Sequence, residues 1–409
     1  MKVLLTSFMT GQNVRNALIA LHKADCLHSF HNRLFFTKHQ FWHYLVKINY
    51  LNRFKRRELP VDFSPFIHSY WIKELSAIFF DRVGLKSLSK KLADKSIANE
   101  EFDRKVAKYI HRHHDEIDCI YGYEDTSYYS FSEAKKYGIK CIYELPIGYW
   151  RKKNQILSEQ INTRPEWAST MGIDCNDIEK LHRKDLEISL ADLIVVPSVF
   201  VEKSLELYPD SLPPIAIVPY GAPSQINYNK NGIRGGREKL KALFCGGLTQ
   251  RKGIADIADV YDRTSDLMEL TVIGNGNIES CPPLGNFINK VNHIKSVSHD
   301  ELLKIMAESD IFLFPSHFEG FALVVFDAMS QGCPLITTLV TSGPIKDGYD
   351  GWIVEPGDVD SMVKLIESLY TNREYITRCS QNARLTASKN TWEKYHGDLI
   401  NVLNSFSKL

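Results

Sequence analysis

Short apolar runs alternate along this chain with longer stretches whose apolar residues recur at helical spacing. In the first half, this pattern predicts strands at 2–7, 118–123 and 139–143, a helix beginning near Gly11 and another at 127–136. In the second half, it predicts strands at 243–245, 270–273 and 311–314, with helices from 253 and over 300–307. Such alternation is typical of an α/β protein with parallel sheets, in which ligands bind at the carboxyl ends of the strands.

The segment 311–358 carries the strongest chemical signal. Its strand stops at Pro315, and Gly320 precedes a helical pattern that ends at Gly332. A helix that begins there offers free N–H groups to an anion such as phosphate. At the helical rise of about 1.5 Å per residue, Glu319 and Asp327 would lie roughly 12 Å apart. This separation fits a diphosphate between two hydroxyl-bearing groups. The alternative is an ordinary amphipathic helix with solvated acids.

The same segment resembles the family-4 retaining glycosyltransferases of the GT-B fold. The matching residues are Pro315, Ser316, Glu319, Gly320, Phe321, Leu323, Ala328, Met329, Gly332, Pro334, Ile336, Gly343, Asp347, Gly348, Gly351, Pro356, Gly357 and Asp358. The stretches 187–200, 217–222 and 244–253 also resemble family motifs. The resemblance implies two Rossmann-like doubly wound domains that face each other across a cleft.

The resemblance also implies roles for individual residues in binding a nucleoside-diphosphate sugar. Lys252 and the N–H groups of Phe321, Ala322 and Leu323 would hold the diphosphate, Glu319 the sugar and Asp327 the ribose. Backbone groups of Lys295, Ser296 and Val297 would contact the base. The remaining donor-site positions are Gly246, Gly247, Arg251 and Gly320, and Gly11 would belong to an N-terminal glycine loop. Alternatively, Arg251 and Lys252 are a solvated pair, and Gly11 only allows a tight turn.

Ala322 stands where the family has glycine, a small change that leaves its N–H available, and three further positions depart from the family pattern. Gly247 stands where the family has arginine, and Arg251 is the candidate substitute, although a neighbouring position directs its side chain differently. Asp327 replaces glutamate and is shorter by ~1.5 Å. Tyr123 stands where many members have histidine, which leaves Glu124 to position or deprotonate the acceptor hydroxyl. The alternative for Glu124 is an N-terminal cap of the next helix.

The domain organisation follows from length and from one flexible stretch. We expect an acceptor domain at 1–225, a donor domain at 238–390, and a helix at 391–409 that crosses back to the first domain. Glycine and asparagine residues between 220 and 239 predict a linker. The segment 144–150, after the strand at 139–143, is expected to line the cleft.

Composition adds expectations about surroundings and partners. Eight scattered cysteines without a C-x-x-C pair, and no evident signal peptide or spanning run, predict a cytoplasmic protein. Residues 1–112 hold 20 Lys and Arg against 9 Asp and Glu, or +11, within a chain of net charge +1. Aromatic and basic residues at 41–57 suggest an amphipathic helix that contacts an anionic membrane, or one that packs on the core. No nucleic-acid module accompanies this charge, and the histidines at 111–114 lack metal-ligand spacing.

These observations favour a hexosyltransferase that needs neither metal nor cofactor and transfers a sugar to a hydroxyl of a glycan, a lipid-linked acceptor or a small molecule. The resemblance to the family implies that the anomeric configuration is retained. One alternative is a catalytically inactive scaffold that binds a nucleotide sugar, suggested by the departures at Tyr123, Gly247 and Asp327. Another is a peripheral membrane adaptor, which liposome sedimentation with and without anionic lipid distinguishes. The donor base, the sugar and the acceptor stay open at the level of sequence.

Overall fold

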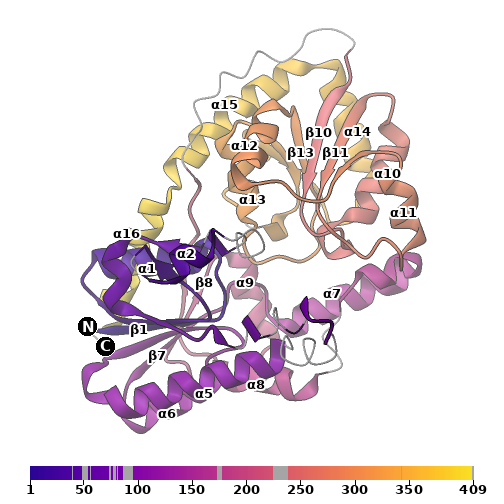
Figure 1. Cartoon of the computed structure of the whole chain (residues 1–409). Coiled ribbons are helices and arrows are strands. Elements are labelled where there is room, and N and C mark those ends of the chain that lie inside the picture. The colour runs from indigo at the N-terminus through magenta and orange to yellow at the C-terminus, as the bar shows by residue number, and fades with distance from the viewer. Residues whose placement is uncertain are drawn as a thin grey trace.

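The computed structural model describes residues 1–38, 40–47, 54–55, 57–72, 75–76, 80, 82–85, 95–172, 177–223, 238–341 and 343–407. Within these ranges two parallel sheets lie side by side, each between layers of helices (Figure 1). We call the layers around the first sheet the amino-terminal lobe and those around the second sheet the carboxy-terminal lobe. The predicted α/β class is confirmed.

The first sheet has the strand order β5-β2-β1-β6-β7-β8-β9. Its strands are β1 (Val3–Ser7), β2 (Leu27–Asn32), β5 (Ile67–Ser69), β6 (Cys119–Tyr123), β7 (Lys140–Glu144), β8 (Leu193–Val196) and β9 (Ile215–Ile217). Two short strands, β3 (Phe36–Thr37) and β4 (Glu58–Leu59), pair separately. The central strands β1 and β6 are buried along their whole length because helices cover both faces of the sheet.

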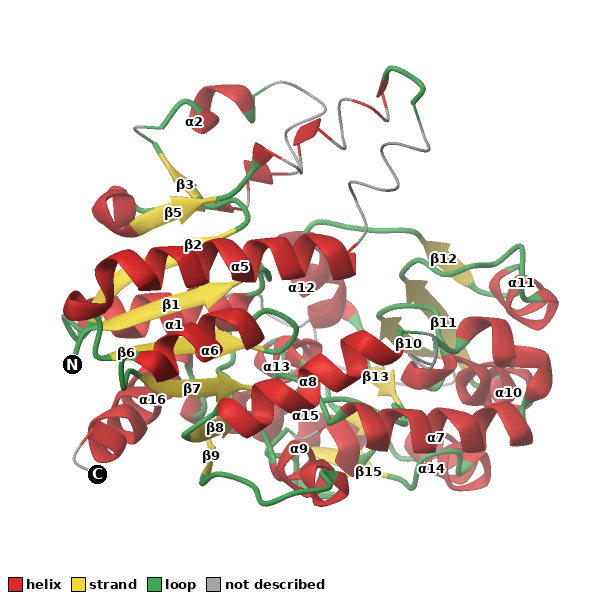
Figure 2. Cartoon of the chain, turned by 90° about the horizontal axis from the view of Figure 1, so that it is seen from below, coloured by secondary structure: helices red, strands yellow, loops and turns green. Residues whose placement is uncertain are grey.

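Helices of the amino-terminal lobe connect these strands. They are α1 (Gln12–Lys23), α2 (Trp42–Leu45), α5 (Lys95–His113), α6 (Tyr128–Lys136), α7 (Trp150–Thr163), α8 (Ile178–Leu190) and α9 (Val199–Ser204). Short 3-10 turns are η2 (Val61–Phe66), η3 (His114–Glu116), η4 (Pro165–Thr170) and η5 (Leu205–Leu207). Figure 2 shows α5, α6 and α8 together on one face of the sheet, and α1 and α16 (Trp392–Ser407) lie on the other.

The second sheet has the order β12-β11-β10-β13-β14-β15. Its strands are β10 (Leu240–Cys245), β11 (Met268–Ile273), β12 (Asn292–Ile294), β13 (Ile311–Phe314), β14 (Leu335–Thr337) and β15 (Gly351–Ile353). The helices are α10 (Ile254–Thr264), α11 (Pro282–Ile288), α12 (His299–Glu308), α13 (Leu323–Ser330), α14 (Val359–Thr371) and α15 (Arg373–Lys389), with the 3-10 turns η6 (Gln250–Lys252) and η7 (Leu339–Thr341). The order places β10 and β13 in the middle, so the segments that follow them lie next to each other.

Two segments join the lobes in addition to the chain connection. Helix α16 crosses back and packs its buried residues Tyr395, Leu399 and Leu403 toward α1, with His396 3.0 Å from the Asn16 side-chain oxygen (Figure 1). Helix α7 and turn η4 extend from the first sheet to the carboxy-terminal lobe, where η4 contacts α11 and η6. The sequence pattern gave no prediction of this second crossing. Most of the predicted linker, residues 224–237, lies outside the described residues.

The aromatic and basic stretch at 41–57 does not form one amphipathic helix in its described part. Only the four residues of α2 are helical before the gap at 48–53, and β4 follows at Glu58. Large apolar side chains are nevertheless exposed in this region, namely Phe41, Tyr44, Ile72, Val83 and Leu85. Contact with an anionic membrane therefore stays a prediction. No described helix combines the length and apolar character that a membrane span requires.

Candidate functional site

The loop after β10 carries Gly246 and Gly247 to the carboxyl edge of the second sheet. Gly246 donates its N–H to the Ile273 carbonyl at 2.9 Å, which keeps the loop close to β11. Turn η6 follows and ends at Gly253, whose φ is +75°. A Cβ at Gly253 would lie 2.2 Å from the Pro315 carbonyl oxygen, so only glycine fits here. This turn places the side chains at the end of η6 beside the segment that follows β13.

Arg251 and Lys252 converge on one carboxylate, that of Glu319. The Lys252 ammonium contacts Glu319 Oε1, and an Arg251 guanidinium nitrogen lies 3.0 Å from the same oxygen. Arg251 also donates to the Phe318 carbonyl at 2.8 Å. Burial lowers the pKa of Lys252, and the adjoining Glu319 carboxylate acts in the opposite direction. The structure thus brings the three predicted charged residues together, and Arg251 reaches the same point as Lys252 despite its neighbouring position.

The start of α13 differs from the prediction at one residue. The sequence led us to expect that the N–H of Ala322 is available to a phosphate. In the structure, this N–H donates to the Thr341 carbonyl at 3.2 Å, because η7 folds back against the start of α13. The expectation for the Ala322 N–H is therefore wrong. In the described ranges the N–H groups of Phe321 and Leu323 have no acceptor, so they keep the predicted ability to bind an anion.

Asp327 lies on α13 with a mostly buried side chain, and the imidazole of His299 at the start of α12 lies 3.9 Å from its carboxylate. Burial raises the pKa of Asp327 to about 6, and His299 works against this shift. His299 had no role in the sequence analysis, since it precedes α12 by pattern and is 28 positions from Asp327. The pair offers both an acceptor and a donor to hydroxyl groups of a ligand.

Replacing Asp327 with asparagine is expected to stabilise the folded protein above pH 6. The folded pKa of about 6 exceeds the ordinary value of 3.8, so the penalty of an ionised buried carboxylate accumulates between pH 3.8 and about 6. At pH 7.5 the variant should gain about 1–3 kcal/mol, and progressively less toward pH 4. Urea unfolding at several pH values measures this gain, and a gain that is the same at every pH would contradict it.

The segment predicted to contact a base runs from β12 to α12. The Lys295 carbonyl accepts a hydrogen bond from the Asn275 side chain at 3.0 Å, and Ser298 caps α12 by accepting from the Glu301 N–H at 3.2 Å. Ser296 and Val297 lie between the two residues, Lys295 and Ser298, that make these hydrogen bonds. The Lys295 carbonyl therefore already has a donor, and the role of this segment at a base stays a prediction.

A cavity of about 450 Å³ opens between the lobes and includes part of the predicted donor site. Leu323, Asp327 and His299 line it from the carboxy-terminal lobe, and α1, α16 and the connection after β9 line it from the other side. Gly11 immediately precedes α1, as its N-cap residue. The lining residues are Gln12, Arg15, Asn16, Ile19, Lys23, Gly221, Pro223, His299, Leu323, Asp327, Trp392, Glu393 and His396.

Glu124 has a side chain that is only 10% exposed, and it is ion-paired rather than free. Its carboxylate accepts from the Lys184 ammonium of α8 at 2.9 Å. Burial raises the pKa of Glu124, and Lys184 opposes this shift. The alternative role as an N-terminal cap is wrong, because the Asp103 carboxylate instead accepts from the N–H groups of Tyr129 and Ser130 in the first turn of α6, at 2.6 and 3.1 Å. A role of Glu124 toward an acceptor hydroxyl stays a prediction.

Glu144 does not line an open cleft, contrary to expectation. Its carboxylate is buried and accepts from the hydroxyls of Tyr121 and Tyr220, both at 2.6 Å. Burial raises the pKa of Glu144, against the effect of these hydrogen bonds. The Tyr220 ring lies 5.3 Å from that of Phe321, so the cluster links the amino-terminal lobe to the donor loop. Tyr123 is fully buried beside Tyr121, with ring centroids 5.8 Å apart.

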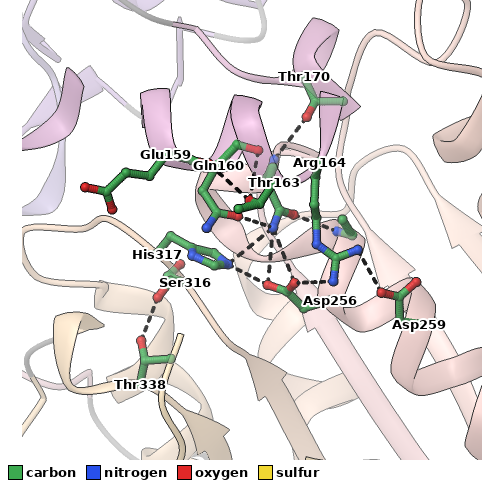
Figure 3. A network of polar contacts seen from close by, with 12 residues as sticks. Glu159, Gln160, Thr163, Arg164, Thr170, Asp256, Asp259, Ser316, His317 and Thr338 are labelled. Atoms are coloured by element: carbon green, nitrogen blue, oxygen red, sulfur yellow. Dashed lines mark hydrogen bonds and ion pairs between the residues drawn. The ribbon is translucent and has the colours of Figure 1, made fainter. Parts of the chain in front are cut away.

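A polar network behind η6 fastens η4 and the end of α7 to the carboxy-terminal lobe (Figure 3). The Asp256 carboxylate is fully buried and lies 2.5 Å from His317 and 3.1 Å from Arg164. Gln250 donates from its side chain to Gln160 of α7 at 3.0 Å. Sequence reasoning missed this network because Gln160, Arg164 and His317 stand 61 to 92 positions from their partners, although His317 stands within the recognised motif. It supports the turn that carries Arg251 and Lys252.

Residues 229–386 match the family model of glycosyl transferases group 1. An uncharacterized glycosyltransferase of Methanocaldococcus jannaschii is 29% identical over 213 residues, which are 50% of this chain and 57% of that protein. A lipopolysaccharide 1,6-galactosyltransferase of Escherichia coli K12 is 26% identical over 38% of this chain and 45% of its own length. Alignments with the first curated relatives span about half of those proteins, between 39% and 57% of their lengths.

Solved structures match the fold over nearly the whole chain. Sucrose-phosphate synthase from Thermosynechococcus elongatus has a TM-score of 0.67 at 15% identity, with 100% of this chain and 99% of that chain covered. Anabaena HepE in complex with UDP and glucose has a TM-score of 0.63 at 15% identity, with coverage of 99% and 100%. At this identity the likeness concerns the fold alone. The chain thus has the GT-B fold, and its residues 229–386 are similar to the glycosyl transferases group 1 family.

Proposed function

We propose that this protein is a retaining glycosyltransferase that moves a hexose-type sugar from a nucleoside-diphosphate sugar to a hydroxyl acceptor. The observation that carries the proposal is the convergence of Arg251 and Lys252 on Glu319, beside the start of α13. Two cations next to one acid can hold a diphosphate and an adjoining sugar hydroxyl at the same time. The activities in the names of the relatives point in the same direction, and the retaining outcome rests on the family resemblance.

In the proposed reaction, the bond between the anomeric carbon and the diphosphate oxygen breaks, and a bond from that carbon to the acceptor oxygen forms. Negative charge grows on the leaving diphosphate, and Lys252, Arg251 and the Phe321 and Leu323 N–H groups stabilise it. These groups would perform the charge neutralisation for which other transferases use a divalent ion. Glu319 would hold a sugar hydroxyl. The proton of the acceptor hydroxyl passes to the leaving nucleoside diphosphate or to solvent.

A ligand screen followed by a turnover assay tests this function. UDP, GDP, ADP, UDP-glucose, GDP-mannose and ADP-glucose are compared by thermal shift, since a ligand at 100 times its dissociation constant stabilises by ~2.7 kcal/mol. We expect one base to give the larger shift and the matching sugar nucleotide to be hydrolysed slowly without acceptor. Binding without any turnover would favour the scaffold alternative. Activity that EDTA abolishes and Mg²⁺ restores would contradict metal independence.

A further inference from the structure

The loop 318–320, which contains Glu319, is held by the amino-terminal lobe as well as by its own. The Gly148 N–H donates to the Glu319 carbonyl at 3.2 Å. The hydroxyl of Ser198, which is buried, donates to the Gly320 carbonyl at 2.7 Å. Gly148 follows β7 and Ser198 precedes α9, so two separate connections of the first sheet reach the same three-residue loop.

The fit between the loop and these connections leaves no room for extra atoms. A Cβ at Gly320 would lie 2.0 Å from the Pro146 carbonyl oxygen, and a Cβ at Gly148 would lie 2.6 Å from the Phe318 ring. The Phe318 ring also meets the Phe200 ring edge to face, with centroids 5.7 Å apart. Only glycine fits at these two positions while the lobes pack against each other in this way.

The carboxy-terminal lobe alone holds the loop less completely. Arg251 donates to the Phe318 carbonyl at 2.8 Å, and the Ser316 hydroxyl lies 3.3 Å from the Glu319 carboxylate. The carbonyls of residues 319 and 320 are held from the other lobe. Arg251 thus holds the peptide plane before the Glu319 Cα from its own lobe, whereas Gly148 holds the plane after it and Ser198 holds the next plane, after the Gly320 Cα. The two planes held from the amino-terminal lobe help to fix the backbone from which the Glu319 carboxylate projects.

We propose that Ser198 is a positioning residue, which orients Glu319 for the sugar of the donor in the lobe arrangement of this structure. This inference rests on the proposed function and assigns to the amino-terminal lobe a part in assembling the donor site. Ser198 touches neither substrate nor reacting atoms, so it acts through the Gly320 carbonyl. Without its hydrogen bond, Glu319 should still pair with Lys252 but spend less time in the productive orientation.

Ser198 also caps α9, since its Oγ accepts from the Val201 N–H at 3.3 Å. A useful substitution must separate this structural role from positioning. Ser198→Gly removes the hydroxyl, yet glycine is nearly as good an N-cap as serine. Ser198→Ala removes both the hydroxyl and the cap. Ser198→Thr keeps a hydroxyl that can make both hydrogen bonds. Asp177→Ala is the control, because it removes only the side-chain cap of α8, which accepts from the Lys180 N–H at 3.0 Å.

The assay measures kcat for hydrolysis of UDP-glucose, GDP-mannose or ADP-glucose, whichever the wild-type protein accepts, together with the Kd of the corresponding nucleoside diphosphate. Loss of one hydrogen bond predicts that Ser198→Gly and Ser198→Ala both lower kcat by about 3- to 10-fold. The nucleotide Kd should not change, because Glu319 faces the sugar. Ser198→Thr should restore kcat, and Asp177→Ala should keep it.

The results distinguish the inference from the proposed function. An active wild-type protein with a Ser198→Gly variant of equal kcat overturns the inference alone. A loss of kcat in Ser198→Ala that is absent in Ser198→Gly also overturns it, since the effect would then come from the helix cap. A wild-type protein that turns over none of the three donors overturns the proposed function, and the inference with it.

Discussion

Replacing Lys252 with methionine is expected to lower kcat for donor turnover by about 100- to 1,000-fold, the usual effect of removing one preorganised group that stabilises transition-state charge. The Lys252 side chain is only 14% exposed and contacts Glu319, and its ammonium lies 4.8 Å from the centre of the Phe314 ring. Methionine keeps contact with that ring but cannot balance the charge of a leaving diphosphate. Initial-rate measurements with saturating donor give kcat directly.

The stability of this variant should behave differently from its activity. Burial lowers the pKa of Lys252, which means that burying its charged form is unfavourable to the folded state. A methionine of similar volume should therefore lower the free energy of unfolding only slightly. Lys304→Met serves as the control, since Lys304 is an exposed lysine of α12 in the same lobe. A Lys252→Met protein with native circular dichroism and wild-type kcat would show that Lys252 has no part in the reaction.

The substitution Asp256→Ala is expected to lower the free energy of unfolding by about 3–5 kcal/mol, because it leaves buried partners of an ion pair uncompensated. Asp256 is fully buried and contacts His317, Arg164 and Gln250. Its loss should loosen both η6 and the contact between α7 and the carboxy-terminal lobe. Urea unfolding monitored by tryptophan fluorescence measures the effect, and Trp167 of η4 lies close to the altered interface.

A matched control exists on the same helix. Asp259 contacts the other nitrogen of Arg164 at 2.7 Å, but its side chain is 46% exposed. Exposed ion pairs contribute about 0–1 kcal/mol, so Asp259→Ala should shift the urea midpoint only slightly. Equal shifts for Asp256→Ala and Asp259→Ala would mean that burial of the network does not determine its contribution.

The sequence predicted those features that depend on neighbours along the chain. The apolar runs at 311–314 and 118–123 coincide with β13 and β6, because central strands of a parallel sheet must be apolar on both faces. The proximity of Lys252 and Glu319 could also be predicted, since known family motifs surround both residues. For these strands and loops, the local sequence pattern or a motif is enough to predict the course of the backbone.

Features that depend on contacts between distant segments could not be predicted. The direction of Arg251 is set by a 3-10 turn and by the left-handed Gly253, neither of which has a periodic signal. The Ala322 N–H is occupied by a carbonyl of η7, and Glu124 pairs with a lysine 60 positions away. Each of these contacts satisfies a buried polar group, and many partners along the chain could have done so equally well.

The two crossings between the lobes have a consequence for dissecting the protein. Helix α16 belongs by sequence to the end of the chain but covers α1, and η4 belongs to the beginning but buries Trp167 and Thr170 near α11 and η6. A fragment cut between the two sheets would therefore lose apolar cover on both pieces, one at α1 and the other at α11. We therefore expect neither piece to reach its native structure unless the other piece is present.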